Sequence, residues 1–293
     1  MKIDTLILSG GGPGGIAYPT IFKALYEYSI LTPQLSGIKD IIVTSAGIVM
    51  AYCLLLHMNN DTIHDFICRF DLSVSLQLDD ISVDGLLFEG GLFETHMIQA
   101  LFKSITNHVL HRDDISLLEL YEHSKITLHV KVFNITDKLY EFISHKNHPG
   151  LSLITLAQMT TSIPIVFKPI SYNGKMYCDG GIRNGYPYGY LPSPNYLGLK
   201  LQSNITHIKD NIPLVDYLLH ILQGEETTHP HDPRVINVHT NTGFDFDMSD
   251  SKKQKLFETT YHNVSTHITQ YLLDDKTDDK TISTTPSLQE HSL

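Results

Sequence analysis

The chain has 293 residues, of which 42% are hydrophobic and 18% charged, a composition typical of a globular protein. Its 32 acidic and 21 basic side chains give a net charge of −11, which argues against nucleic-acid binding and against electrostatic docking on anionic lipid. The 3 cysteines are widely spaced, so neither a disulfide framework nor a zinc site is expected. No signal peptide follows Met1, and we expect a cytoplasmic protein.

The N-terminal half alternates short apolar runs with segments of helical periodicity. The expected elements are strands at 3–8 and 41–44 and helices at 21–28, 46–58, 60–70, 94–105 and after Ser116. The run 41–58 contains no acidic or basic residue, but Thr44, Ser45 and Gly47 lie inside it. We therefore interpret it as a buried strand followed by a buried helix, not as a membrane span.

The C-terminal half continues the same alternation. The expected elements are strands at 126–133, 196–201 and 235–239, helices at 152–161, 212–223 and 249–271, and a hairpin turn at Asn173 and Gly174 whose second strand ends at Asp179. Strands that alternate with helices predict an α/β fold with a mostly parallel central sheet sandwiched by helices. We expect one domain over residues 1–273 and a disordered polar tail over 274–293.

A glycine-rich loop, "GGGPGG" over residues 10–15, follows the first strand and precedes a helix. This pattern fits a dinucleotide site, but such a site also needs an acidic residue at the end of the second strand, where Thr44 and Ser45 stand. The alternative is an oxyanion hole, in which backbone amides stabilise the charge that develops on a carbonyl oxygen. A tight turn without a ligand explains so many glycines poorly, because each costs conformational entropy on folding.

Ser45 lies in "VTSAG", between the second expected strand and its helix. A strand-to-helix elbow exposes a serine hydroxyl and directs the helix N-terminus toward a developing oxyanion. The serine still needs a base, and Asp179 is a candidate because Gly180 and Gly181 after it permit close approach. On the same strand, Cys178 should point away from Asp179.

Three motifs in this order, "GGGPGG" at 10–15, "TSAG" at 44–47 and "DGG" at 179–181, resemble the patatin-like phospholipase family. The similarity extends over nearly the whole chain apart from the tail, including "TSIPIVFKP" at 161–169. The resemblance implies a three-layer fold and a lipid acyl hydrolase of the phospholipase A type. It implies a serine–aspartate dyad, a lipid or phospholipid ester as substrate, transient membrane-surface contact, and neither metal nor cofactor.

Carried over residue by residue, the resemblance makes Ser45 the nucleophile and Asp179 the general base. The implied oxyanion donors are the backbone amides of Gly10, Gly11, Gly12 and Ala46. The remaining motif glycines are Gly14, Gly15, Gly47, Gly180 and Gly181.

Two positions depart from the family pattern. Gly14 stands where the family usually carries a basic residue, and Val43 replaces the first glycine of the elbow, so its side chain must find room beside the turn. A catalytically degenerate lipid-binding protein and a nucleotide-binding α/β protein therefore stay open as alternatives.

Histidines offer a further alternative, because a serine–histidine–aspartate triad would place its histidine after the acid. The histidines after Asp179 are His207, His220, His229, His231, His239, His262 and His267, and none lies in a recognisable motif. The "HPHDP" stretch at 229–233 reads as an exposed turn and not as part of a metal site.

Overall fold

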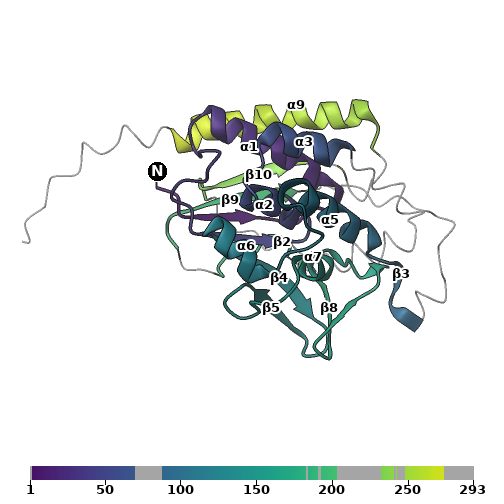
Figure 1. Cartoon of the computed structure of the whole chain (residues 1–293). Helices are drawn as coiled ribbons and strands as arrows, with labels where there is room; N and C mark the ends of the chain where they lie inside the picture. The colour runs from purple at the N-terminus through teal and green to yellow at the C-terminus, as the bar shows by residue number, and fades with distance from the viewer. Residues whose placement is uncertain are drawn as a thin grey trace, which may run out of the picture.

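A computed structural model describes residues 2–69, 88–182, 184–190, 193–202, 232–240, 242 and 248–273. Its centre is a sheet of eight strands in the order β10-β9-β1-β2-β4-β8-β7, with β5 also paired to β4 (Figure 1). The strands are β1 (Thr5–Leu8), β2 (Asp40–Thr44), β4 (Thr127–Asn134), β5 (Leu139–Ile143), β7 (Ile170–Tyr172), β8 (Lys175–Asp179), β9 (Tyr196–Gln202) and β10 (Val235–His239).

The first five strands of that order are parallel, and β5, β7 and β8 add antiparallel pairs at the β4 end. The predicted α/β class with a mostly parallel sheet is confirmed. Because β1, β2 and β4 are parallel, their carboxyl ends meet at one edge, which brings the glycine loop beside Ser45. The antiparallel β8 enters from the opposite direction, and its last residue, Asp179, pairs with Val132 at the same edge.

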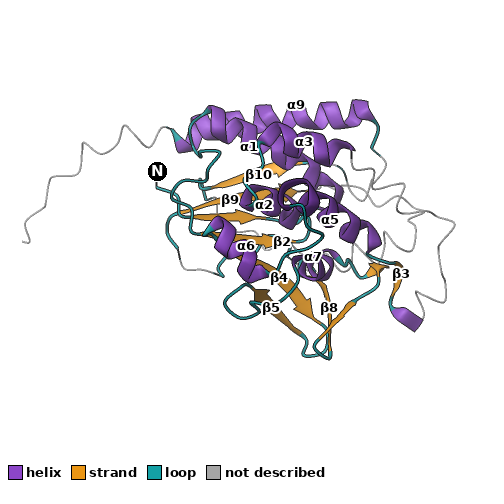
Figure 2. Cartoon of the chain, viewed as in Figure 1, coloured by secondary structure: helices purple, strands orange, loops and turns teal. Residues whose placement is uncertain are grey.

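The helices that the structure describes cover one face of this sheet and its β10 end (Figure 2). They are α1 (Tyr18–Glu27), α2 (Gly47–Leu55), α3 (Asn60–Arg69), α5 (His96–Leu110), α6 (Leu117–Ser124), α7 (Leu153–Thr161) and α9 (Asp250–His267). A short 3-10 helix, η1 (Gly12–Ala17), precedes α1, and a π-helical turn (Ile268–Leu272) follows α9. None of the helices that the structure describes has both the length and the apolar character needed to cross a membrane.

Alternation along the central strands divides the buried side chains between two faces. Leu6 and Leu8 of β1 join the large core under the helices, whereas Ile7 belongs to a smaller cluster with Tyr186 and Tyr196 on the other face. In β4, Val130 and Val132 likewise face the large core. Lys131 lies between them, so its side chain points to the opposite face.

Most predicted elements agree with the structure within a few residues, and the capping box of α6 forms as expected between Ser116 and Glu119. The helix expected from residue 94 begins at His96 and extends to Leu110. At the start of helix α3, the Asn59 side chain accepts a hydrogen bond from the Thr62 amide at 2.8 Å.

Three short strands were not predicted: β5, β3 (Gly91–Phe93) and β6 (Ile165–Phe167), of which the last two pair in a small parallel sheet of their own. The expected helix at 212–223, most of the loop before Gly91 and the tail at 274–293 lie outside the described residues.

Candidate active site

Ser45 occupies a sharp turn between β2 and α2. Its backbone has a φ of +51°, a left-handed conformation that is uncommon for a non-glycine residue and costs on the order of 1–3 kcal/mol. The Ser45 amide donates to Thr160 Oγ1 at 2.9 Å, and its carbonyl accepts from the Ile48 amide at 3.0 Å. These two contacts hold the elbow in its strained conformation and aim the hydroxyl out of the strand.

Val43 does not prevent this turn. Its side chain is fully buried in the large core, and its backbone pairs with Leu8 and Val130 in the sheet. The elbow depends instead on Gly47, where a Cβ atom would lie 2.8 Å from the Ser9 carbonyl oxygen and 3.0 Å from that of Leu8. The core therefore accommodates the Val43 side chain, which replaces the first glycine of the family's elbow.

Asp179 lies within hydrogen-bond distance of the serine. The Ser45 hydroxyl donates to Asp179 Oδ2 at 2.6 Å, and the Gly181 amide donates to Asp179 Oδ1 at 2.6 Å. The Asp179 amide in turn donates to the Ser162 carbonyl at 2.9 Å, which fixes the end of β8 against α7. Ser45 and Asp179 lie more than a hundred positions apart in the sequence, yet their side chains are in direct contact.

Burial raises the pKa of the Asp179 carboxyl to about 6. The hydrogen bonds from Ser45 and Gly181 and the positive charge of Lys131 oppose this rise. A carboxylate with such a pKa is ionised at neutral pH and is still basic enough to accept a proton from a hydroxyl during a reaction. Cys178, its neighbour on β8, pairs with Phe133 and has its thiol pKa raised to about 12 by burial, which leaves it protonated.

The glycine loop packs directly against the elbow. A Cβ atom at Gly10 would lie 2.9 Å from Ser45 Cβ, and one at Gly15 would lie 3.0 Å from Ala46 Cβ. A hydrogen bond stabilises the start of this loop: the Tyr18 hydroxyl donates to the Ser9 carbonyl at 2.6 Å. Glycines are thus required for close approach to Ser45, which favours the oxyanion interpretation over a dinucleotide site.

The predicted oxyanion donors do not all remain available. The Gly10 amide donates to the Gly185 carbonyl at 2.9 Å, so we remove it from the predicted donors. Gly12 and Ala46 line the cavity at Ser45. Gly14 faces the other way: a Cβ there would lie 2.7 Å from Thr240 Oγ1, so Thr240 occupies the space that a larger side chain would need.

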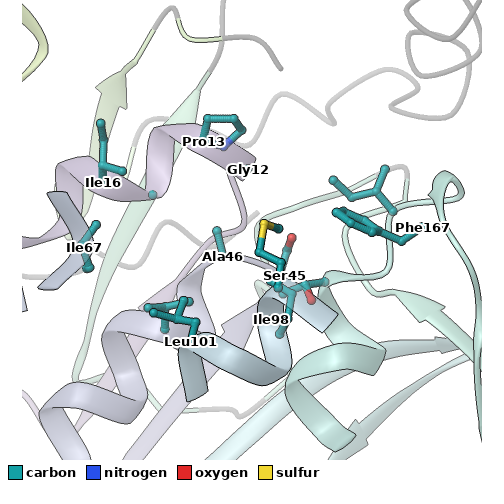
Figure 3. Close-up of a pocket in the computed structure, with 14 residues that line it drawn as sticks. Gly12, Pro13, Ile16, Ser45, Ala46, Ile67, Ile98, Leu101 and Phe167 are labelled. Atoms are coloured by element: carbon teal, nitrogen blue, oxygen red, sulfur yellow. The ribbon is translucent and has the colours of Figure 1, made fainter. Parts of the chain in front are cut away.

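The cavity above Ser45 has a volume of about 100 Å³ and is mainly apolar (Figure 3). Its walls come from η1, α2, α3, α5 and β6, with side chains that include Ile16, Val49, Ile67, Ile98, Leu101 and Phe167. Ser45 and Ala46 are among the residues that line it (Figure 3). Such walls bind a hydrocarbon chain by the hydrophobic effect and present few groups that would hydrogen-bond a nucleotide.

Sequence reasoning did not single out Thr160 or Lys131, although both contact this site. Thr160 gave no signal, since a threonine near a helix end is common. Lys131 gave none either, because it alternates with apolar residues on the same side of the expected strand as Thr127 and His129, where a solvated lysine is common.

The structure also locates several residues of the histidine-triad and metal-site alternatives. Of the histidines after Asp179 that the structure describes, His267 contacts the Pro233 carbonyl at 2.8 Å, and His239 lines a separate pocket with Thr240 and Lys255. Asp232 of "HPHDP" pairs with Arg234 at 2.8 Å, whereas His229 and His231 lie outside the described residues. Within the described residues no group of three or more His, Cys, Asp or Glu side chains is placed to hold a metal ion.

A family model described as patatin-like phospholipase matches residues 6–192, which is more than half of the chain. The chain belongs to the patatin-like phospholipase family. The matched range includes the glycine loop, Ser45 and Asp179.

Two viral proteins are similar in sequence. A probable lipid hydrolase, 463L, of Invertebrate iridescent virus 6 is 27% identical over 186 residues, which cover 62% of this chain and 61% of that protein. An uncharacterized protein of Acanthamoeba polyphaga mimivirus is 22% identical over 64% of this chain and 60% of its own length. The alignments thus span about three-fifths of each relative.

Two solved structures share the fold. VipD from Legionella pneumophila matches 92% of this chain and 67% of its own, with a TM-score of 0.63 and 15% identity. ExoU, in its heterodimeric complex with SpcU from the type III secretion system of Pseudomonas aeruginosa, matches 92% of this chain and 52% of its own, with a TM-score of 0.54 and 18% identity. At these identities the likeness concerns the fold alone.

Proposed function

We propose that this chain is a lipid acyl hydrolase that cleaves carboxylic esters with Ser45 as nucleophile and Asp179 as general base. The observation that carries the proposal is the 2.6 Å hydrogen bond to Asp179 from the hydroxyl of Ser45, which lines an apolar cavity. Membership of the patatin-like phospholipase family and the similarity to a probable lipid hydrolase support it.

The first half of the reaction forms an acyl-enzyme. Ser45 Oγ attacks the ester carbonyl carbon while its proton passes to Asp179 Oδ2. The carbonyl oxygen becomes an oxyanion, for which we propose the amides of Gly12 and Ala46, and of Gly11 beside them, as donors. The intermediate then collapses: the bond from carbon to the alcohol oxygen breaks, and the leaving alcohol takes the proton from Asp179.

The second half releases the acid. Asp179 removes a proton from a water molecule, whose oxygen attacks the acyl carbon, and the proton returns to Ser45 Oγ as the acyl-serine bond breaks. The products are a free fatty acid and the alcohol part of the lipid. The apolar cavity would bind the acyl chain, so we propose a lipid or phospholipid ester as substrate, met during transient contact with a membrane surface.

The direct test measures free fatty acid released from phosphatidylcholine vesicles by the wild-type chain and by Ser45→Ala and Asp179→Asn. We expect release by the wild type and loss of nearly all of it in both variants. Vesicle lipid that is bound without release of fatty acid would identify a degenerate binding protein instead. Release that persists in Ser45→Ala would contradict the assignment of the nucleophile.

A further inference from the structure

Lys131 is a buried cation directly behind the site. It lies in β4, where its backbone pairs with Thr44, and only 7% of the residue is exposed. Its ammonium group donates to the Asn184 carbonyl at 2.9 Å and stands 4.3 Å from the centre of the Tyr140 ring. A carbonyl oxygen and an aromatic face are the two groups that best replace water around a cation without neutralising it.

The Asn184 carbonyl, to which Lys131 donates, belongs to the segment that follows Asp179 and leads to the glycine loop in space. Tyr140, which lies under the ammonium group, donates its hydroxyl to the Ile182 carbonyl of the same segment. Three residues further on, the Gly185 carbonyl accepts the Gly10 amide at 2.9 Å. Lys131 and Tyr140 therefore fix the short connection that leads from the base to the loop beside the nucleophile.

The backbone of Lys131 is in the same network. Its carbonyl accepts the Thr160 hydroxyl at 2.8 Å, and Thr160 in turn accepts the Ser45 amide at 2.9 Å. Gly180 is pressed against this carbonyl: a Cβ atom there would lie 2.2 Å from the Lys131 oxygen. One residue thus contacts the elbow through its backbone and the segment after Asp179 through its side chain.

The charges of Lys131 and Asp179 act on one another through the buried space between them. Burial lowers the pKa of Lys131 to about 8, and the Asp179 charge opposes that fall. Burial raises the pKa of Asp179, which Ser45, Gly181 and Lys131 oppose in that order. Among the described residues, Cys178 next to Asp179 is also titratable, and burial raises its thiol pKa to about 12, so it stays neutral at the pH values considered. Lys131 thus adds a positive charge to the two hydrogen bonds, from Ser45 and Gly181, that oppose the effect of burial on the base.

We propose that Lys131 is a positioning residue, which holds the segment between Asp179 and the glycine loop and supplies the positive charge that keeps Asp179 ionised and able to accept the Ser45 proton. The inference rests on the proposed function, because it concerns the base of that reaction. It assigns Lys131 no contact with the substrate, since its ammonium group is committed to Asn184 and Tyr140 on the face opposite the cavity.

The test is the pH dependence of kcat/KM for p-nitrophenyl butyrate with the full chain and with Lys131→Met. We expect wild-type activity to rise as pH increases through about 6, where Asp179 ionises. Without the cation, the carboxylate is less stable and this rise should move upward by about one pH unit. The loss should be on the order of tenfold below pH 5 and should disappear above about pH 8, where Asp179 is ionised in both proteins.

Two further variants separate charge from other effects. Lys131→Gln keeps a donor for the Asn184 carbonyl but removes the charge, and we expect the same upward shift. Lys175→Met is the matched control: Lys175 lies on β8, four residues before Asp179, but it is only half-buried and pairs with Asp137 at 2.6 Å. Its profile should coincide with that of the wild type.

An unchanged acid limb in both Lys131 variants, or a loss that is equal at every pH, would overturn the inference. If Lys131→Met does not fold, as judged by thermal melting, Lys131→Gln decides the question. Activity that persists in Ser45→Ala would instead overturn the proposed function. Loss of activity in Ser45→Ala together with an unmoved limb in the Lys131 variants would leave the proposed function standing and reject only the role of Lys131.

Discussion

Different kinds of side chains surround the two sides of the Ser45–Asp179 pair. On the cavity side, helices supply aliphatic and aromatic side chains such as Leu101 and Phe167. On the other side of the sheet, the Lys131 ammonium group lies over the Tyr140 ring. Both side chains donate hydrogen bonds to backbone carbonyls of the segment after Asp179. Under the proposed function, we expect substrate binding and proton transfer to be separable, because a change on one side should leave the other side intact.

The largest expected effect comes from removing the base. Asp179→Asn keeps the shape of the side chain but cannot accept the Ser45 proton, so we expect kcat for ester hydrolysis to fall on the order of 10³-fold or more. Steady-state release of p-nitrophenol from p-nitrophenyl butyrate measures it. The matched control is Asp137→Asn, which changes an exposed carboxylate away from the cavity and should leave kcat within about twofold. Equal losses in both variants would refute the assignment of the base.

A change confined to the cavity side should alter substrate choice and not chemistry. Leu101→Trp adds bulk to a wall of the cavity, and we expect kcat/KM for a palmitoyl ester to fall by about 10- to 100-fold, with little change for an acetyl ester. Competition between the two p-nitrophenyl esters measures the ratio. Leu118→Trp, on the exposed side of α6, is the control. A parallel fall for both esters in Leu101→Trp would mean that the cavity does not hold the acyl chain.

Thr160 joins the two sides through the elbow. Thr160→Val has nearly the same shape but leaves the buried Ser45 amide without its acceptor, which should lower the free energy of unfolding by about 1–3 kcal/mol. Because the same contact holds the strained Ser45 backbone, kcat should also fall, by about tenfold. Urea unfolding and steady-state kinetics measure the two effects. Full stability together with full activity would show that the elbow does not depend on Thr160.

The last expected effect concerns stability alone and has an unusual sign. Since the folded protein raises the pKa of Asp179 to about 6, the folded state binds a proton there that the unfolded state has already lost, and stability falls as pH rises toward that value. Asp179→Asn removes this penalty. We expect the variant to be more stable than the wild type at pH 8, by up to about 3 kcal/mol, and equally stable near pH 3.

Thermal melting at several pH values measures this difference. Asp137→Asn should act in the opposite direction, because its ion pair with Lys175 lowers the pKa of Asp137. An Asp179→Asn variant that is less stable than the wild type at pH 8 would contradict the account of a base held ionised against burial.

Much of this arrangement could be predicted from the sequence, because its signals are local. The glycine loop, the serine between a strand and a helix, and the hairpin that ends at Asp179 each depend on a few adjacent residues. Parallel packing of β1 and β2 then brings the loop beside the elbow without further information. The α/β class follows from the same alternation.

The remaining features depend on contacts between distant parts of the chain. The hydrogen bond from the Gly10 amide to the Gly185 carbonyl depends on the path of the segment after Asp179. No sequence pattern near Gly10 indicates it. Strands β3 and β6 have three residues each and exist because they pair with one another. The neighbours of Lys131 are Tyr140, Thr160 and Asn184, which are distant from it in the sequence, so the local pattern did not indicate them.

The most direct test of the central claim is covalent labelling of Ser45 by a fluorophosphonate probe, followed by intact-mass and peptide analysis. We expect one label per chain in the wild type, attached to Ser45, and slow labelling in Asp179→Asn because the hydroxyl loses its base. Ser45→Ala should remain unlabelled. Labelling that continues unchanged in Ser45→Ala, or that occurs at another residue in the wild type, would contradict the central claim.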